Sequence, residues 1–210
     1  METRILYWKW SQKLIIRMAR IEILVEEPSM KEFLGILLPK VIHAPWVLNE
    51  NYFIRSFEGK NDLQKNIPNK IKVFSNWGNE NVGVVIIQDQ DSSDCKKLKR
   101  KLLDLCVNHG NCPSLVRIVC RELESWYIGD FEAVNHAYPS FKHQYYISKS
   151  KYRVPDNCNA YDELKKILPD FQKVGGARKI APYIDVSNNK SVSFQQTISG
   201  LLNFFEQIRD

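Results

Sequence analysis

Short apolar runs alternate with amphipathic stretches from residue 21 onward, which is the pattern of a sheet covered by helices. The runs predict four strands, at residues 21–25, 52–57, 82–87 and 115–120. The third run is almost wholly apolar and predicts a strand buried on both faces, as strands of a parallel sheet are. We therefore expect an α/β fold with a Rossmann-like, mainly parallel sheet flanked by helices.

The segments between these strands have apolar residues at helical spacing. They predict helices at 30–42 and 60–77 and a third that begins after Ser93 or Asp94, with Ser29 as the cap of the first. Asp130 is interpreted as the cap of a helix at 131–137. Further along the chain, helices are predicted at 161–168 and 193–208, with no clear strand between them. We expect an α/β core over 21–130 and a helical C-terminal lobe over 131–210, packed on the core.

The net charge of +6 is concentrated at the start of the chain, since residues 1–20 carry five basic side chains and one acidic one. The remainder is nearly neutral, so the overall charge is weak evidence for a nucleic-acid surface. Residues 1–20 lack the apolar core of a secretory signal, and we interpret them as a leader or as a mis-assigned start, with Met18 as the alternative first residue. The most apolar long stretch, 33–48, is interrupted by prolines and charges, so a cytoplasmic protein is expected.

Five cysteines, an odd number, favour reduced thiols over a disulfide framework. Cys106, His109 and Cys112, with Cys120 nearby, are ligand types that zinc accepts. Their spacing is not that of a common structural zinc site, and buried or incidental thiols are the favoured interpretation.

Acidic residues follow three of the four predicted strands. Glu26 and Glu27 follow the first, Asp89 and Asp91 the third, and Glu122 and Glu124 the fourth. The carboxyl ends of neighbouring parallel strands converge on one crevice, where so many carboxylates would repel each other without a cation. Oxygen ligands without matched His or Cys favour Mg²⁺ or Mn²⁺, which bind phosphates and activate water.

A simpler interpretation applies to some of these acids, because an Asp-x-Asp after a strand is common as a loop and helix cap. Glu27, Asp94 and Glu124 are the members expected to be capping or solvated, although Glu124 stays a candidate metal ligand. The candidate catalytic residues are Glu26, Asp89, Asp91 and Glu122.

Basic residues near glycines are candidate phosphate contacts. Lys60 follows Gly59, and Lys173 and Arg178 flank Gly175 and Gly176 in what could be a phosphate-binding loop that enters a helix. Solvated lysines are the plain alternative. No Gly-x-Ser-x-Gly is present and the histidines lack a nucleophile at a known spacing, which argues against a covalent hydrolase.

The segments VEEPSM and DQDSSD, each between a strand and a helix, resemble the TOPRIM domain shared by topoisomerases, primases and overcoming-lysogenization-defect (OLD) nucleases. The resemblance implies that Glu26 is the family's Glu and that Asp89 and Asp91 are its Asp-x-Asp, with Glu122 as an extra acid at a second metal. Further segments, including RELESWYIGD and KVGGARKIAPYID, resemble an uncharacterised bacterial family of TOPRIM-like proteins over residues 20–205. Members of that family often occur beside ABC- or SMC-type ATPases, which implies a role in defence against phage.

Three hypotheses follow from these patterns. The first is a Mg²⁺- or Mn²⁺-dependent nuclease acting on DNA or RNA as the effector of an ATPase. The second is a non-catalytic subunit that uses the same fold to bind nucleic acid or to dock on the ATPase. The third is nucleotidyl or phosphoryl transfer. A homodimer is compatible with each, and the sequence does not separate DNA from RNA or endonuclease from exonuclease.

Overall fold

The computed structural model describes residues 18–78 and 80–209. The predicted leader therefore lies outside the described residues except for 18–20, which begin the first strand. Four strands form one parallel sheet in the order β2-β1-β3-β4. They are β1 (Met18–Val25), β2 (Tyr52–Ser56), β3 (Glu80–Asp89) and β4 (Ser114–Val119). The α/β class and the parallel sheet are as predicted, and β1 and β3 are longer than the apolar runs that predicted them.

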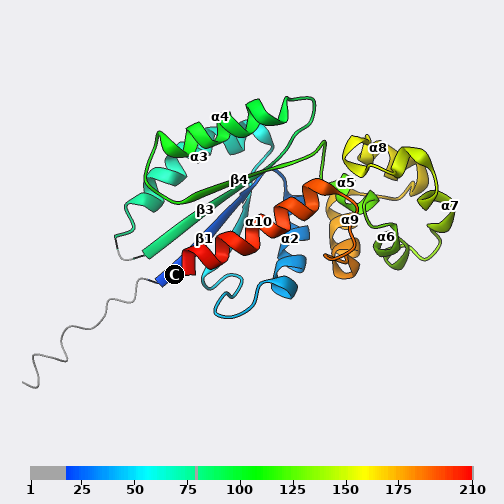
Figure 1. The fold of residues 1–210 in the computed structure, drawn as a ribbon, viewed down its shortest axis with the longest axis horizontal. Helices are drawn as coiled ribbons and strands as arrows, with labels where there is room; N and C mark the ends of the chain where they lie inside the picture. The colour runs from blue at the N-terminus through cyan, green and yellow to red at the C-terminus, as the bar shows by residue number, and fades with distance from the viewer. Residues whose placement is uncertain (1–17, 79, 210) are drawn as a thin grey trace, which may run out of the picture.

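Helices cover both faces of this sheet (Figure 1). One face packs against α2 (Pro28–Val41) and α10 (Val192–Arg209), and the other against α3 (Lys60–Ser75) and α4 (Cys95–Val107). Strand β3 contributes to both cores: Val85 and Ile87 face the first pair of helices, and Val84 and Ile86 face the second. All four side chains are fully buried, which confirms the prediction of a strand covered on both faces.

The ends of these helices test the predicted caps. Asp94 caps α4 by accepting a hydrogen bond from the Lys97 amide at 2.8 Å, as predicted. The prediction for Ser29 was wrong, because α2 begins two residues earlier than predicted, at Pro28, and Ser29 lies inside the helix. Proline fits the first helical position, where its missing amide proton costs no hydrogen bond.

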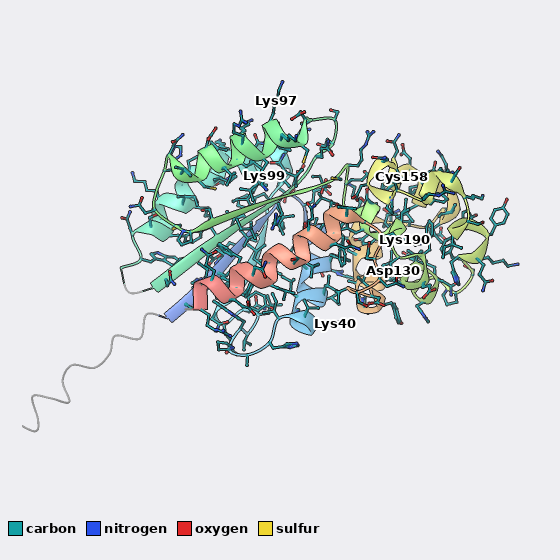
Figure 2. All side chains as sticks on the ribbon, viewed as in Figure 1. Lys40, Lys97, Lys99, Asp130, Cys158 and Lys190 are labelled. Atoms are coloured by element: carbon teal, nitrogen blue, oxygen red, sulfur yellow. The ribbon has the colours of Figure 1, made fainter. Side chains whose placement is uncertain are left out.

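The C-terminal part of the chain is helical, as predicted, and forms a group of short elements beside the carboxyl ends of the strands (Figure 1). These elements are α5 (Glu124–Ile128), α6 (Phe131–Ala137), α7 (Gln144–Ile147), η1 (Ser150–Tyr152), η2 (Pro155–Asn157), α8 (Ala160–Ile167), α9 (Lys173–Ile180) and η3 (Ala181–Tyr183). Asp130, labelled in Figure 2, caps α6 through the Ala133 amide at 2.9 Å, which confirms that prediction.

Helix α10 returns from this lobe and packs against β1, β3 and β4. A side chain at Gly83 would meet Phe204 and Ile208 within 3 Å, so the glycine allows the helix to lie directly on the sheet. The division of the chain at residue 130 stays a prediction. No described helix combines the length and apolar character needed to cross a membrane.

The cysteines form no zinc site within residues 18–78 and 80–209, since no group of three or more His, Cys, Asp or Glu side chains there is arranged to hold a metal ion. Cys106 is buried, and the ring of His109 contacts the Leu105 carbonyl oxygen through Nδ1 at 2.9 Å. Cys106 and Cys158 are buried, and Cys95, Cys112 and Cys120 are partly buried.

Candidate functional site

Three buried carboxylates come from three different segments at the carboxyl ends of the strands. Glu26 follows β1, Asp89 is the last residue of β3, and Glu124 begins α5 just after β4. Only 8% of Glu26, 9% of Asp89 and 1% of Glu124 is exposed. The parallel register places these strand ends side by side, because Val25 pairs with Ile87 and Asp89 with Val119. We call Glu26, Asp89 and Glu124 the carboxylate cluster.

Backbone amides hold two members of the cluster in place. Glu26 Oε2 accepts a hydrogen bond from the Asp89 amide at 3.2 Å, and Asp89 Oδ2 accepts one from the Leu123 amide at 3.4 Å. Both bonds are long, so they fix position more than they offset the cost of burying charge.

Glu124 has no such support. Both of its carboxylate oxygens are buried and lack a hydrogen-bond partner among the described residues. The hydroxyl of Tyr127, on the same short helix, is likewise buried and unpartnered within the described structure. The rings of Tyr127 and Trp126 contact Phe33 of α2, at 5.5 and 5.6 Å between ring centroids, so α5 is packed against α2. Buried polar atoms without partners are rare and indicate a site completed by something else.

Burial and mutual repulsion favour protonation of the cluster. Burial raises the pKa of Glu26 to about 7, and the charge of Asp91 adds to the shift. Burial also raises the pKa of Glu124 to about 7, although Lys173 opposes it. The pKa of Asp89 is raised well above its usual value, first by burial and then by Glu124 and Glu26. Ionisation of the cluster is therefore unfavourable, because the protein does not fully compensate the negative charge that it would create.

The other two predicted catalytic residues lie next to the cluster but are more accessible. Asp91 has a 41% exposed side chain, adopts a left-handed backbone conformation with φ of 51° and binds Lys60 at 2.8 Å. Glu122 accepts a hydrogen bond from the Tyr161 amide at 2.8 Å, close to the start of α8. Both residues line an open pocket of about 240 Å³ together with Arg121, Asn159, Tyr161 and Asp162.

The predicted phosphate contacts are engaged with carboxylates. Lys60 pairs with Asp91, and Lys173 binds both oxygens of Glu27, at 2.9 and 3.1 Å. Burial alone would lower the pKa of Lys173, but the bonds to Glu27 and the charges of Glu124 and Asp89 raise it. Arg178 pairs with Glu32 instead, at 2.9 Å, and is 61% exposed. The segment of Lys173 is the helix α9 rather than the predicted loop, and Gly176 lies inside it against Phe171.

The structure corrects the expectation about Glu124. This acid was expected to be capping or solvated, but it is the most buried member of the cluster, and its helix α5 packs against α2. Glu27 was also expected to be capping or solvated; it occupies the N-cap position of α2 without a side-chain cap hydrogen bond, is half-buried and binds Lys173. The signal for Glu124 was its position two residues before the apolar run Trp126, Tyr127 and Ile128, all of which are buried.

The carboxylate oxygens of the cluster are chemically suited to a divalent cation, but their arrangement in this structure is not that of a metal site. Orphaned carboxylate oxygens with a raised pKa are the oxygen ligands that Mg²⁺ and Mn²⁺ accept. Among the described residues, however, no three acidic, His or Cys groups already surround one point closely enough to hold an ion.

Comparison with known proteins supports the fold. The structure is similar to the C-terminal region of the Xanthomonas campestris pv. campestris OLD protein, in an iodine-phased and a platinum-phased structure. Both matches have a TM-score of 0.50 and 14% sequence identity over 90% of this chain, and they cover 97% and 95% of the respective OLD chains. This likeness supports the TOPRIM-like fold that the sequence predicted.

Sequence comparison shows the family. No curated protein matches this sequence. Residues 25–202 match a family model whose description is "Domain of unknown function (DUF4276)". That range begins at the end of β1 and ends within α10, so it contains every member of the carboxylate cluster and the lobe beside it. The chain therefore belongs to the family described as Domain of unknown function (DUF4276).

Proposed function

We propose that this protein is a nuclease that uses Mg²⁺ or Mn²⁺ to hydrolyse phosphodiester bonds of DNA or RNA. The observation that carries the proposal is the carboxylate cluster, where Glu124 keeps two buried oxygens without a partner among the described residues. A structural carboxylate would be expected to find a donor, whereas a cation ligand needs its oxygens free. The OLD-like fold agrees with this interpretation.

Glu26, Asp89 and Glu124 would hold the cation from the buried side, with Asp91 and Glu122 as ligands from the open pocket. A bound divalent cation would neutralise these carboxylates and stabilise the negative charge that develops on a phosphodiester during cleavage. The open pocket is lined by Asp91 and Glu122, so a phosphodiester that enters it would meet these two proposed ligands. Asp91 lies in a left-handed turn, and its amide donates a hydrogen bond to the Arg121 carbonyl oxygen at 2.9 Å.

Two lysines have separate roles in this proposal. Lys173 is half-buried, and the charges of Glu124 and Asp89 act on it, so we assign to it the stabilisation of negative charge on the scissile phosphate. Lys60 is 49% exposed and pairs with Asp91. If Asp91 served as a cation ligand, Lys60 would lose this partner and would be able to bind a neighbouring phosphate. Arg178 was predicted as a third contact, but its pairing with Glu32 makes it the weakest of the three candidates.

Cleavage assays on purified protein test the proposal. Labelled single- and double-stranded DNA and RNA are incubated with Mn²⁺, Mg²⁺ or EDTA, and Asp89→Asn is compared with the isosteric control Asp104→Asn, an exposed residue of α4. We expect metal-dependent cleavage that falls by at least about 100-fold in Asp89→Asn, the cost of losing a charge at the reacting centre. Equal cleavage by both variants would show that the activity does not come from this site.

A non-catalytic role is the alternative, and one observation favours it. Lys60 and Lys173 already neutralise Asp91 and Glu27, which leaves the site partly compensated without a cation. A subunit that only binds nucleic acid, or docks on an ATPase, needs no more than this. Calorimetry with Mn²⁺ separates the two roles, since a binding module with an internally paired site would show no heat of metal binding.

The partner is also a proposal, and the resemblance of the sequence to ATPase-linked families supports it. In this view the protein is a cytoplasmic effector of an ABC- or SMC-type ATPase in defence against phage. Adding an ATPase encoded beside it, with ATP, to the cleavage assay should raise the rate or restrict the substrate. An identical rate and product pattern with and without the ATPase would count against the partnership.

A further inference from the structure

The segment between α6 and α8 is basic and aromatic and carries no acidic residue between Glu132 and Asp156. Several large apolar side chains in it are exposed: Tyr145 to 65%, Val154 to 49% and Ile147 to 42%. Exposed Lys142 and Arg153 and the partly buried Lys149 accompany them. We call this set the basic–aromatic surface, formed by Lys142, Tyr145, Ile147, Lys149, Arg153 and Val154. Figure 1 shows α7, which carries part of it, at the far end of the lobe from the sheet.

A packed aromatic core lies directly beneath this surface. Phe131 contacts Phe141 and Tyr152 with ring centroids 5.5 and 5.1 Å apart, and Phe141 stacks on Tyr146 at 5.1 Å. The exposed residues of α7 and η1 are therefore carried on buried rings rather than on a loose loop. Such support fixes side chains at low cost in conformational entropy.

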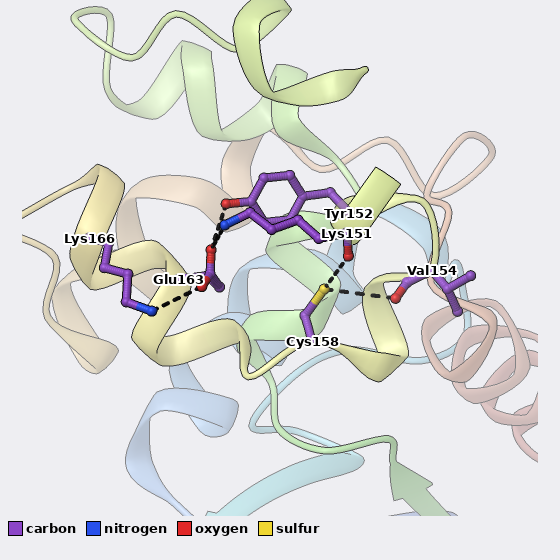
Figure 3. Close-up of polar contacts among 6 residues, drawn as sticks. All are labelled: Lys151, Tyr152, Val154, Cys158, Glu163 and Lys166. Carbon is purple, nitrogen blue, oxygen red and sulfur yellow. Dashed lines mark hydrogen bonds and ion pairs between the residues drawn. The ribbon is translucent and has the colours of Figure 1, made fainter. Parts of the chain in front are cut away.

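Polar contacts fasten the same segment to α8 (Figure 3). Glu163 binds the ammonium of Lys151 and accepts a hydrogen bond from the Tyr152 hydroxyl at 2.7 Å. The Cys158 thiol donates to the Lys151 carbonyl at 3.0 Å. Because Lys151 and Lys166 neutralise Glu163, this acid adds little negative charge beneath the surface.

The exposed residues combine cations with a ring. Lys149 Nζ lies 3.9 Å from the Tyr145 ring centroid and 4.6 Å from that of Tyr146. Neither Lys142 nor Arg153 forms an ion pair with an acid in the described part of the chain. Surfaces that bind single-stranded nucleic acid have this composition, because bases stack on aromatic rings while lysines and arginines contact phosphates.

We infer that the basic–aromatic surface binds single-stranded nucleic acid, separately from the carboxylate cluster. Charge complementarity selects a polyanion, and the exposed ring of Tyr145 beside Lys149 selects one with unpaired bases over a duplex or an acidic protein. This inference does not depend on the proposed cleavage, because binding at this surface requires neither the cluster nor a cation. It would place a strand on the outer end of the lobe, away from the sheet.

The test measures the binding of a fluorescent single-stranded oligonucleotide by fluorescence anisotropy. The measurement is made in EDTA, so that metal-dependent cleavage plays no part. Tyr145→Ala is compared with Tyr183→Ala, a matched tyrosine that is 51% exposed outside the surface. We expect Tyr145→Ala to weaken binding about tenfold, the usual effect of losing one stacked base, and Tyr183→Ala to leave it unchanged. Equal affinities of the two variants, or no binding by the unmodified protein, would overturn the inference.

Charge reversal supplies a second readout. Lys142→Glu combined with Arg153→Glu should reduce the slope of log affinity against log salt concentration by at least about 1, whereas Lys72→Glu, exposed on α3, should not. Binding of a duplex or of poly-glutamate as tight as that of the single strand would show a general polyanion site and refute base recognition. Asp89→Asn should bind as the unmodified protein does, so loss of cleavage and loss of this surface are distinguishable.

Discussion

Two buried glutamates at one strand of the sheet have opposite electrostatic surroundings. Glu22, within β1, is fully buried and binds two arginines: Arg20 at 2.7 and 2.9 Å, and Arg55 at 2.5 and 3.1 Å. Glu26, directly after β1, is 8% exposed and accepts one long bond from a backbone amide. Its nearest charges include the carboxylates of Asp91 and Glu27, and its pKa is raised to about 7.

The difference shows which acid the fold itself requires. The guanidinium of Arg20 lies over the rings of Phe53 and Trp77, at 4.0 and 4.8 Å from their centroids, so Glu22 belongs to a complete structural network. Within the described residues Glu26 forms no ion pair, and Lys60 only weakly opposes the cost of burying its charge. This contrast supports the proposal that Glu26 is a cation ligand.

Removing each charge in turn should give the largest contrast. Glu22→Gln leaves Arg20 and Arg55 without their acid and should lower the free energy of unfolding by about 3 kcal/mol, as for other broken buried pairs. Glu26→Gln removes a repulsive charge and should leave the free energy of unfolding unchanged or slightly higher. Urea unfolding at neutral pH without metal measures both. Equal losses in the two variants would show that the two acids are both structural.

A divalent cation should stabilise the protein through the carboxylate cluster and not through the network around Glu22. If the carboxylate cluster binds Mn²⁺, a concentration 100 times the dissociation constant stabilises the protein by about 2.7 kcal/mol. Thermal unfolding of the unmodified protein should shift upward with Mn²⁺, and that of Glu124→Gln should not. Glu206→Gln, an exposed position on α10, is the matched control and should shift as the unmodified protein does. A shift retained by Glu124→Gln would place the cation elsewhere.

Without metal, pH should reveal the uncompensated charge of the cluster. Glu26 and Glu124 have pKa values of about 7 in the folded protein, above the ordinary 4.5. Between these values the folded state holds more protons than the unfolded state, so stability decreases as the pH rises from about 4.5 to about 7, by about 1 to 2 kcal/mol. Denaturant unfolding in EDTA at several pH values measures this slope. Glu124→Gln should make this slope shallower, whereas the control Glu206→Gln should keep it. Stability that rises with pH in both the control and the unmodified protein would contradict the prediction.

The hydrophobic pattern was sufficient to predict the sheet and its covering helices, because the apolar positions of each element show which of its faces is buried. It also placed acids at three strand ends, since parallel strands share an edge. The cluster itself depends on long-range packing that local patterns do not contain. Glu124 is buried because Phe33 covers its helix, and Lys173 meets Glu27 across most of the chain. The error at Ser29 was local, since a proline at the next position toward the N-terminus was the better start of the helix.

A third glutamate completes the comparison and gives the smallest expected effect. Glu163 is paired as Glu22 is, but with lysines that are 53% and 67% exposed, and its pKa is lowered to about 2, chiefly by Lys151 and then by the Tyr152 hydroxyl. The unfolded state therefore takes up the proton first, and the stabilisation present above pH 4.5 is lost as the pH falls toward 2.

Because solvent screens such pairs, Glu163→Gln should lower the free energy of unfolding by only about 1 kcal/mol at neutral pH, and by less at pH 3. Urea unfolding at the two pH values, with Glu206→Gln as control, measures the difference. The sign is opposite to that expected for Glu26 and Glu124, so one titration series distinguishes an acid that the fold pairs from an acid that it leaves for a ligand. A loss at pH 3 as large as that at neutral pH would mean that Glu163 acts through packing rather than through its charge.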